Sequence, residues 1–142
     1  MKRQVDYSKL RGFNYTQSNA KNDRDFWEHY DHEIVDREMA YAARLTLNSA
    51  RIFLPYSVYY NNKEKFLADV KDFVQTAWKH GVSTSPIVYF GFRFLPEDFE
   101  HTPFDGPGLC PVIKSIADKS AWVLGERYFV DLLGAIGDEP GL

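Results

Sequence analysis

The sequence predicts an α/β domain in which parallel strands alternate with helices. Two observations support this class. Short runs rich in β-branched and aromatic residues are bounded by turn formers, and they are separated by segments whose apolar residues recur at helical spacing. The resulting order of strand, helix, strand, helix, strand is typical of crossover connections on a parallel sheet. The chain has 142 residues, the length of a single domain, and we divide it into strand-helix units near 10–47, 49–80 and 84–136.

The first unit combines an aromatic strand with an amphipathic helix. The run LRGFNYTQ (10–17) is predicted to be a strand, and the turn formers of SNAKND follow it as a loop. Val35, Met39 and Ala42 then recur at i, i+4 and i+7, with charged residues on the other faces. This spacing predicts a helix whose N-cap is Asp31, because an aspartate side chain accepts hydrogen bonds from the first free N–H groups of a helix.

The second unit repeats this order. SARIFLPY (49–56) predicts a buried strand that stops at Pro55. The following helix is expected to end at His80-Gly81, because glycine suits the left-handed residue that follows many helices. That helix is predicted from apolar residues at helical spacing, namely Phe66, Val70, Phe73, Val74, Ala77 and Trp78.

The third unit begins with TSPIVYFG (84–91), which predicts a strand. An irregular stretch near 92–118 is rich in proline and glycine, and its phenylalanines argue against disorder. A connection of this length inside a compact domain is usually functional when it is ordered. The last helix, ending near Gly137, is predicted from the apolar spacing of Trp122, Phe129, Leu133 and Ile136.

Composition excludes several classes of function. The net charge of −3 gives no electrostatic reason to bind nucleic acid. The single cysteine, Cys110, excludes an internal disulfide and a cysteine-based zinc site. No run approaches the roughly 20 apolar residues of a membrane span, and the first residues lack the apolar stretch of a signal peptide. The chain as given is therefore expected in the cytoplasm, or outside the cell if its start is incomplete, with no membrane partner.

No residue pattern predicts a metal site or a cofactor. His29 and His32 are three residues apart, whereas a zinc protease helix needs histidines four apart around a glutamate, so we interpret this segment as a solvated helix start. The glycines of 106–108 lack the context of a phosphate loop, and no serine lies in a nucleophile elbow. His101, beside Glu100, fits either an acid/base role or a surface position.

Arg51 is the unusual residue, since its strand is predicted to be buried. A buried guanidinium needs a carboxylate or several acceptors to offset the loss of its hydration. Two interpretations remain open on these grounds. Arg51 forms a structural ion pair, or it is an active-site arginine that orients a catalytic carboxylate or holds a substrate anion.

Four stretches together resemble the opening of a (β/α)8-barrel glycoside hydrolase: RGFNYTQSNA, DREMAYAARLTLNSARIFLPY, FLADVKDFVQTAWKHGVSTSPIVYF and GERYFVDLLGAIGDEP. The likeness is to the cellulase and mannanase group, family 5 and its relatives in clan A, and it covers nearly the whole chain. Its best single marker is the Asn-Ser-x-Arg-Ile pattern of 48–52. The resemblance implies a partial (β/α)8 TIM barrel of about three β-α units with parallel strands, in which 1–142 is one incomplete domain.

The same resemblance implies a sugar site at the carboxyl ends of the strands, where barrel enzymes bind their ligands. In that family the arginine matching Arg51 lies beneath the catalytic nucleophile, which favours the functional interpretation of this residue. Asn14 and Tyr15 at the end of the first strand would face the sugar, as would Tyr56 after the second strand and Phe90 after the third.

Two departures from the family pattern matter. Thr46 stands where relatives often have the glycine that ends the first helix, and a β-branched residue resists a positive φ, so the helix is expected to end differently. The second departure is length, because a complete barrel needs eight strands in about 250 residues and this chain supplies about three. The family takes its two catalytic carboxylates from an Asn-Glu pair after the fourth strand and a glutamate after the seventh, and this sequence has no Asn-Glu dipeptide. We therefore expect a truncated or partial protein related to endo-β-glycanases that act on β-linked polysaccharides, inactive alone because both catalytic carboxylates are missing.

Two alternatives stay open. In the first alternative, the chain is a glycan- or partner-binding module that uses Arg51 and the aromatic stretch without catalysis. In the other alternative it is a small enzyme with Glu139 as acid/base and Asp98, Glu97 or Glu100 as the second carboxylate, although the helical spacing before Glu139 indicates a turn there. The expected partners are an oligo- or polysaccharide and either a second copy or a missing complementary segment. The last expectation follows because helices on one side of three strands would leave an apolar sheet face bare.

Overall fold

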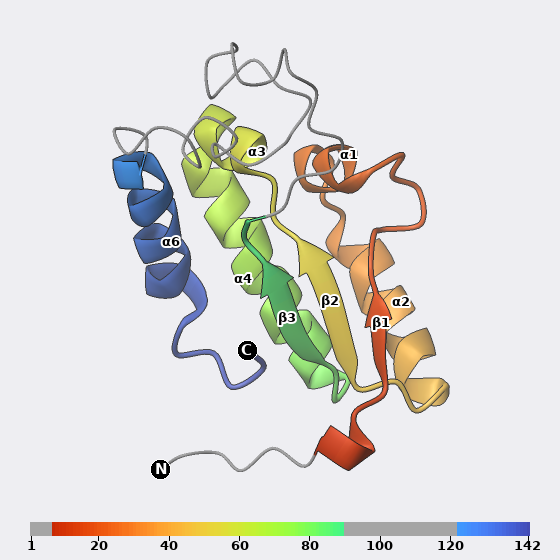
Figure 1. The fold of residues 1–142 in the computed structure, drawn as a ribbon. Coiled ribbons are helices and arrows are strands. Elements are labelled where there is room, and N and C mark those ends of the chain that lie inside the picture. Colours follow the sequence, from red (N-terminus) through yellow and green to blue (C-terminus); the bar gives the residue numbers. More distant parts are fainter. Residues whose placement is uncertain (1–6, 90–121) are drawn as a thin grey trace, which may run out of the picture.

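The computed structural model describes residues 7–89 and 122–142, and at its centre lies a three-stranded parallel sheet. Its strands are β1 (Gly12–Asn14), β2 (Ser49–Phe53) and β3 (Ser83–Ile87), which lie side by side in this order (Figure 1). The predicted α/β class with parallel strands is confirmed. The proline-rich stretch, Phe90, His101 and Cys110 lie outside the described residues.

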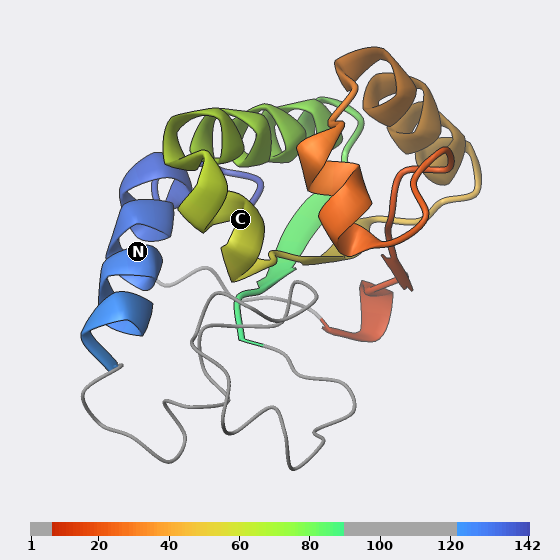
Figure 2. The same cartoon turned by 90° about the horizontal axis from the view of Figure 1, so that it is seen from above.

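The long helices cover one face of this sheet (Figure 2). They are α2 (His32–Arg44), α4 (Lys63–Lys79) and α6 (Trp122–Ile136), and α4 packs between the other two. The predicted cap of α2 is present, since the Asp31 side chain accepts from the N–H groups of Glu33 and Ile34. None of the helices in the described ranges is long and apolar enough to cross a membrane.

Three short helical segments were not expected from the sequence. They are η1 (Tyr7–Lys9), α1 (Asp23–Glu28) and α3 (Tyr56–Asn61), and the last two lie near the carboxyl ends of the strands (Figure 1). The loop assigned to SNAKND ends earlier than expected because Asn22 caps α1 by accepting from the N–H of Asp25. Pro55 likewise precedes α3, and the second strand already stops at Phe53 rather than at Pro55 as predicted.

The core lies between the sheet and the helices. Strand alternation directs Ala50 and Ile52 of β2 toward the helices, and both are fully buried. They meet apolar side chains of the helix layer such as Met39 and Val70, which are also fully buried. Each large apolar side chain buried in this way contributes about 1.5–3 kcal/mol to stability.

Helix α6 uses a different face from the one that its spacing predicts. Of the predicted row only Ile136 is buried, whereas Trp122, Phe129 and Leu133 are 57%, 42% and 47% exposed. The buried row consists of Gly125, Tyr128, Leu132 and Ile136. Both rows are largely apolar, so periodicity alone gives no means of telling which of them faces the core.

Helices α2 and α4 end in the same way. In α4 the N–H of Val82 donates to the carbonyl of Ala77 at 2.9 Å, and Gly81 between them has a φ of 77°. In α2 the N–H of Leu47 donates to the carbonyl of Ala42 at 3.0 Å, with Thr46 at a φ of 62°. Both are Schellman motifs, in which the residue after the cap is left-handed. The expectation that Thr46 would change the helix ending is therefore wrong. Two carbonyls in the last turn of α2 accept the same pair of backbone hydrogen bonds as their counterparts in α4.

Candidate functional site

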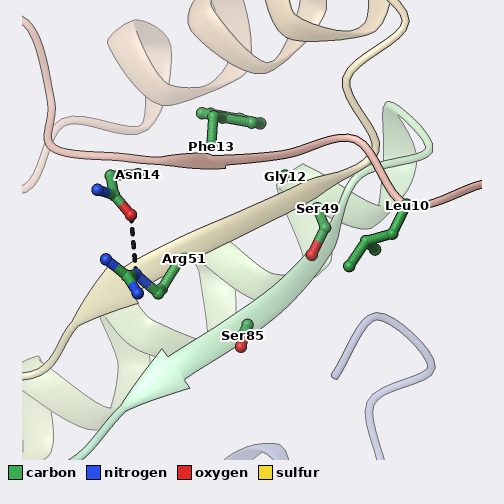
Figure 3. A pocket seen from close by; sticks show the side chains of 7 residues that line it. All are labelled: Leu10, Gly12, Phe13, Asn14, Ser49, Arg51 and Ser85. Carbon is green, nitrogen blue, oxygen red and sulfur yellow. Dashed lines mark hydrogen bonds between the residues drawn. The ribbon is translucent and has the colours of Figure 1, made fainter. Parts of the chain in front are cut away.

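A depression of about 410 Å³ lies along β1, β2 and β3, and its lining includes strand residues that alternate away from the helix layer. Parallel register places Asn14, Arg51 and Ser85 in one row across β1, β2 and β3. Alternation along each strand turns this row away from the helix layer. Figure 3 shows Arg51 between the other two, and the lining consists of Leu10, Gly12, Phe13, Asn14, Ser49, Arg51 and Ser85.

The Arg51 side chain is exposed in this depression, although the sequence predicts a buried arginine. Helices cover one face of β2, and Arg51 points to the other face. Its Nε donates to Asn14 Oδ1 at 2.8 Å, and its guanidinium carbon lies 5.4 Å from the centre of the Phe53 ring. No carboxylate forms an ion pair with Arg51 within residues 7–89 and 122–142, so the structural ion pair considered for this residue is absent from that part of the chain.

Two of the expected sugar-facing aromatics point elsewhere. Tyr15 is 7% exposed and donates from its hydroxyl to Glu38 Oε2 of α2 at 2.6 Å. It follows Asn14 in the chain, so strand geometry sends it to the opposite, helix-covered face. Burial and the hydrogen bond to Glu38 raise the pKa of the Tyr15 hydroxyl well above its usual range.

Tyr56 is also a core residue rather than a wall of the depression. It is 3% exposed at the start of α3, and its ring centre lies 5.5 Å from that of Tyr59 and 5.3 Å from that of Tyr128. The chain turns into a helix at this point, so Tyr56 packs into the aromatic cluster between α3 and α6. Among the predicted site residues in the described ranges, the structure thus brings together Asn14 and Arg51 and separates both tyrosines from them.

Two hydrogen bonds from the helix layer fix the carboxyl end of β2, two residues beyond Arg51. Trp27 of α1 donates from Nε1 to the carbonyl of Phe53 at 2.7 Å. Tyr128 of α6 donates from its buried hydroxyl to the carbonyl of Leu54 at 2.9 Å. Sequence reasoning misses both residues. The sequence offers only a general signal for such residues: a buried tryptophan or tyrosine usually needs a hydrogen-bond partner for its polar atom.

The described sheet face is polar, which corrects the expectation of a bare apolar face. Its two amino-terminal rows are Gly12, Ser49 and Ser83, followed by Asn14, Arg51 and Ser85. Apolar side chains begin only in the last row, where Phe53 pairs with Ile87. Arg51 is the only charged side chain among the seven residues that line the depression. This lining can donate to and accept from hydroxyl groups and can hold an anion.

Two of the described histidines, His32 and His80, link α2 to α4. His32 Nδ1 lies 2.8 Å from Asp72 Oδ2 and links α2 to α4. One turn further along α2, Asp36 Oδ1 lies 2.9 Å from Nε2 of His80, the residue that follows α4. His29 faces only the neighbouring Asp25 of α1, and the described ranges contain no group of three possible metal-ligating side chains.

Glu139 lies in the helix layer. Its carboxylate accepts from Gln75 Nε2 at 2.9 Å and lies 3.5 Å from Lys71 Nζ, both on α4. Two residues later, the carbonyl of Gly141 accepts the N–H of Thr84 near the start of β3 at 2.6 Å. Glu139 therefore lies near the amino ends of the strands and behind the sheet, away from Arg51. This placement agrees with the interpretation of Glu139 as a turn residue, while its partners in the acid/base hypothesis, Asp98, Glu97 and Glu100, lie outside the described residues.

Comparison with known proteins places this fold among glycoside hydrolases. The structure is similar to a GH5_18 protein from Bifidobacterium longum subsp. infantis, with a TM-score of 0.71 and 25% identity over 93% of this chain. It is also similar to a GH5_18 protein from Streptomyces cattleya in complex with GlcNAc, with a TM-score of 0.67 and 20% identity over 93% of this chain.

The likeness is to a part of those proteins. This chain spans about 31% of the first and 32% of the second. No protein-family model and no curated protein matches the sequence. The parallel strands, the helices on one face and these two neighbours lead to one conclusion: the chain resembles part of the (β/α)8 barrel of a family 5 glycoside hydrolase.

Proposed function

We propose that this chain is a partial protein related to endo-β-glycanases that does not hydrolyse glycosides alone. The observation that carries the proposal is the composition of the depression beside Arg51. A retaining glycosidase needs two carboxyl groups about 5–5.5 Å apart at the scissile bond. Within residues 7–89 and 122–142, the seven residues that line the depression supply a cation and hydroxyl groups but no carboxylate.

Glu139 gives no support to an active site of its own. Its carboxylate is engaged by Lys71 and Gln75 in the helix layer, behind the sheet. The test is hydrolysis of activated aryl β-glucosides and β-mannosides by the wild type and by Glu139→Gln. We expect no turnover above the buffer rate from either protein. Turnover by the wild type that Glu139→Gln abolishes would overturn the proposal.

The polar depression favours a second candidate function, glycan binding without catalysis. Asn14, Arg51 and Ser85 form one row of hydrogen-bonding side chains that face solvent. Sugar hydroxyls bind to such mixed donors and acceptors. Because one of the similar proteins was obtained in complex with GlcNAc, this sugar is a suitable first probe, together with cello- and manno-oligosaccharides.

The binding test is a titration followed by NMR amide shifts. Arg51→Gln is the site variant, and Arg44→Gln is its matched control because Arg44 is exposed at the end of α2, in the helix layer. We expect shifts for residues of the depression in the wild type and in the control, and weaker binding by Arg51→Gln. Equal binding by all three proteins would place the sugar elsewhere.

We also propose that further polypeptide covers α6, either a complementary segment of the barrel or a second copy of this chain. The exposed side of this helix carries Trp122, Val123, Phe129, Val130 and Leu133. The similar proteins are about three times as long as this chain, which favours a complementary segment. Sedimentation velocity distinguishes the two, since a second copy gives a dimer that Phe129→Ser with Leu133→Ser dissociates, whereas a missing segment leaves a 16.5 kDa monomer.

A further inference from the structure

We propose that the depression beside Arg51 selects a sugar that carries a carboxylate, such as a uronic acid residue. This inference rests on the proposed glycan-binding function and names the chemical class of its ligand. It follows from how Arg51 is held, from what surrounds it and from the absence of a competing acid in the described part of the site.

Asn14 orients the guanidinium of Arg51. It accepts the Nε proton at 2.8 Å, so the side-on donor of the arginine is already used. The two terminal nitrogens form no hydrogen bond or ion pair with another described residue and remain available as an end-on fork. A planar guanidinium fork matches the two oxygens of a carboxylate and can bind them through two parallel hydrogen bonds.

The neighbouring positions suit the rest of a sugar acid. Ser85 flanks Arg51 on β3, and Ser49 lies two residues before Arg51 on β2. Both offer hydroxyl groups, while Gly12 and the two serines are small and leave the volume of about 410 Å³ open above the sheet. A ring whose carboxylate meets Arg51 therefore has room and hydrogen-bonding partners for its hydroxyl groups.

The electrostatics of the site favour a single negative charge. Arg51 is the only charged residue among the described residues of the lining, so none of those residues competes for it or repels an incoming anion. A phosphate group at neutral pH carries up to two charges and offers more acceptors than one arginine can satisfy. One guanidinium fork thus fits a carboxylate better than a phosphate.

The experiment compares methyl β-D-glucuronide, methyl β-D-glucoside and acetate by NMR titration of the full chain. We expect the glucuronide to bind about 2- to 5-fold more tightly than the glucoside, the range that an exposed ion pair supports. Acetate should bind more weakly than the glucuronide because it lacks the ring hydroxyls. The preference should shrink as sodium chloride is raised, since salt screens exposed charges.

Two variants of the same residue separate charge from shape. Arg51→Gln should bind both glycosides equally, and Arg51→Lys should keep part of the preference because it keeps the charge but loses the fork. Arg44→Gln should behave as the wild type does. Amide spectra of each variant confirm that it is folded.

The outcomes distinguish this inference from the function on which it rests. Equal binding of glucuronide and glucoside overturns the carboxylate preference and leaves glycan binding intact. A preference that persists in Arg51→Gln, or acetate binding as tightly as the glucuronide, also overturns it. Binding of neither glycoside overturns both proposals.

Discussion

Replacing Thr46 by glycine should stabilise the protein, because Thr46 adopts a left-handed backbone conformation that glycine adopts at lower cost. Thr46 has a φ of 62° at the end of α2, in the position that Gly81 occupies at the end of α4 with a φ of 77°. Its side chain is exposed, so removing it sacrifices no core contact. The hydrogen bonds from Thr46 and Leu47 to the last turn of α2, at 2.9 and 3.0 Å, are backbone bonds that glycine retains.

The magnitude follows from two opposing terms. An L-residue in the left-handed region costs roughly 1–2 kcal/mol relative to the right-handed one, and glycine escapes this cost. The greater freedom of glycine in the unfolded chain offsets about 0.4–1 kcal/mol of that gain. Thr46→Gly should therefore raise the free energy of unfolding by about 0.5–1 kcal/mol, which corresponds to a rise of about 2–4 °C in Tm for a chain of this size.

The assay is urea unfolding followed by circular dichroism, with thermal melts as a second measurement. Gly81→Thr is the matched opposite change. A Cβ added at Gly81 meets no atom within 4 Å, so its cost reports the backbone conformation rather than a clash. We expect Gly81→Thr to lower the free energy of unfolding by at least the amount that Thr46→Gly raises it. A Thr46→Gly protein no more stable than the wild type, together with a harmless Gly81→Thr, would refute the reasoning.

Three further predictions concern the contacts that hold the sheet and helices together. Tyr128→Phe leaves the carbonyl of Leu54 without its buried donor and should cost about 1–3 kcal/mol in urea unfolding, whereas a loss near zero would show that the bond is not needed. Gly141→Ala puts a Cβ 2.8 Å from Trp78 Cβ and 3.1 Å from the Val74 carbonyl, so it should release the Thr84 amide to faster hydrogen exchange; unchanged exchange would contradict the tight fit. The hydrogen bond to Asp72 raises the pKa of His32, so this pair stabilises the fold below the unfolded histidine pKa of 6.5 and loses that effect as pH rises through the higher folded pKa. The difference in the free energy of unfolding between wild type and His32→Gln, below about 1 kcal/mol for so exposed a pair, should thus be larger at pH 5.5 than at pH 8.5 in urea unfolding, and a difference independent of pH would contradict it.

The order of strands and helices could be predicted because periodicity reports local structure directly. Val35, Met39 and Ala42 repeat at helical spacing and are buried in α2, and the residues that predict α4 behave in the same way except for Trp78, which is 37% exposed. The short helices escape prediction because α1 and α3 have only six residues each. Six residues span less than two helical turns, too few for a periodic pattern to develop.

The candidate site could be predicted only in part. Whether a strand side chain points into the core or into the depression depends on which face of the sheet the helices cover. Asn14 and Tyr15 are adjacent, so at most one of them can point into the depression, and the structure selects Asn14. Arg51 stands out in the sequence as a charge in an apolar run, yet the sequence gives no means of knowing that only one face of β2 is packed by helices. For α6, two apolar rows are alternatives for the core, and the buried row is the one that contains Tyr128, whose hydroxyl donates to the carbonyl of Leu54.

The two exposed surfaces of this chain differ in the kind of covering that would stabilise them. An apolar covering over Arg51 would bury a guanidinium that has no counterion in the described residues, at a cost of several kcal/mol. Whatever covers the sheet face must therefore bring an acidic or hydroxyl-rich group, or leave water in place. The exposed side of α6 has the opposite requirement, because burying the exposed parts of Phe129 and Leu133 removes apolar area from water. Association through α6 and ligand binding at Arg51 would thus use different forces on different layers of the fold, so neither requires the other.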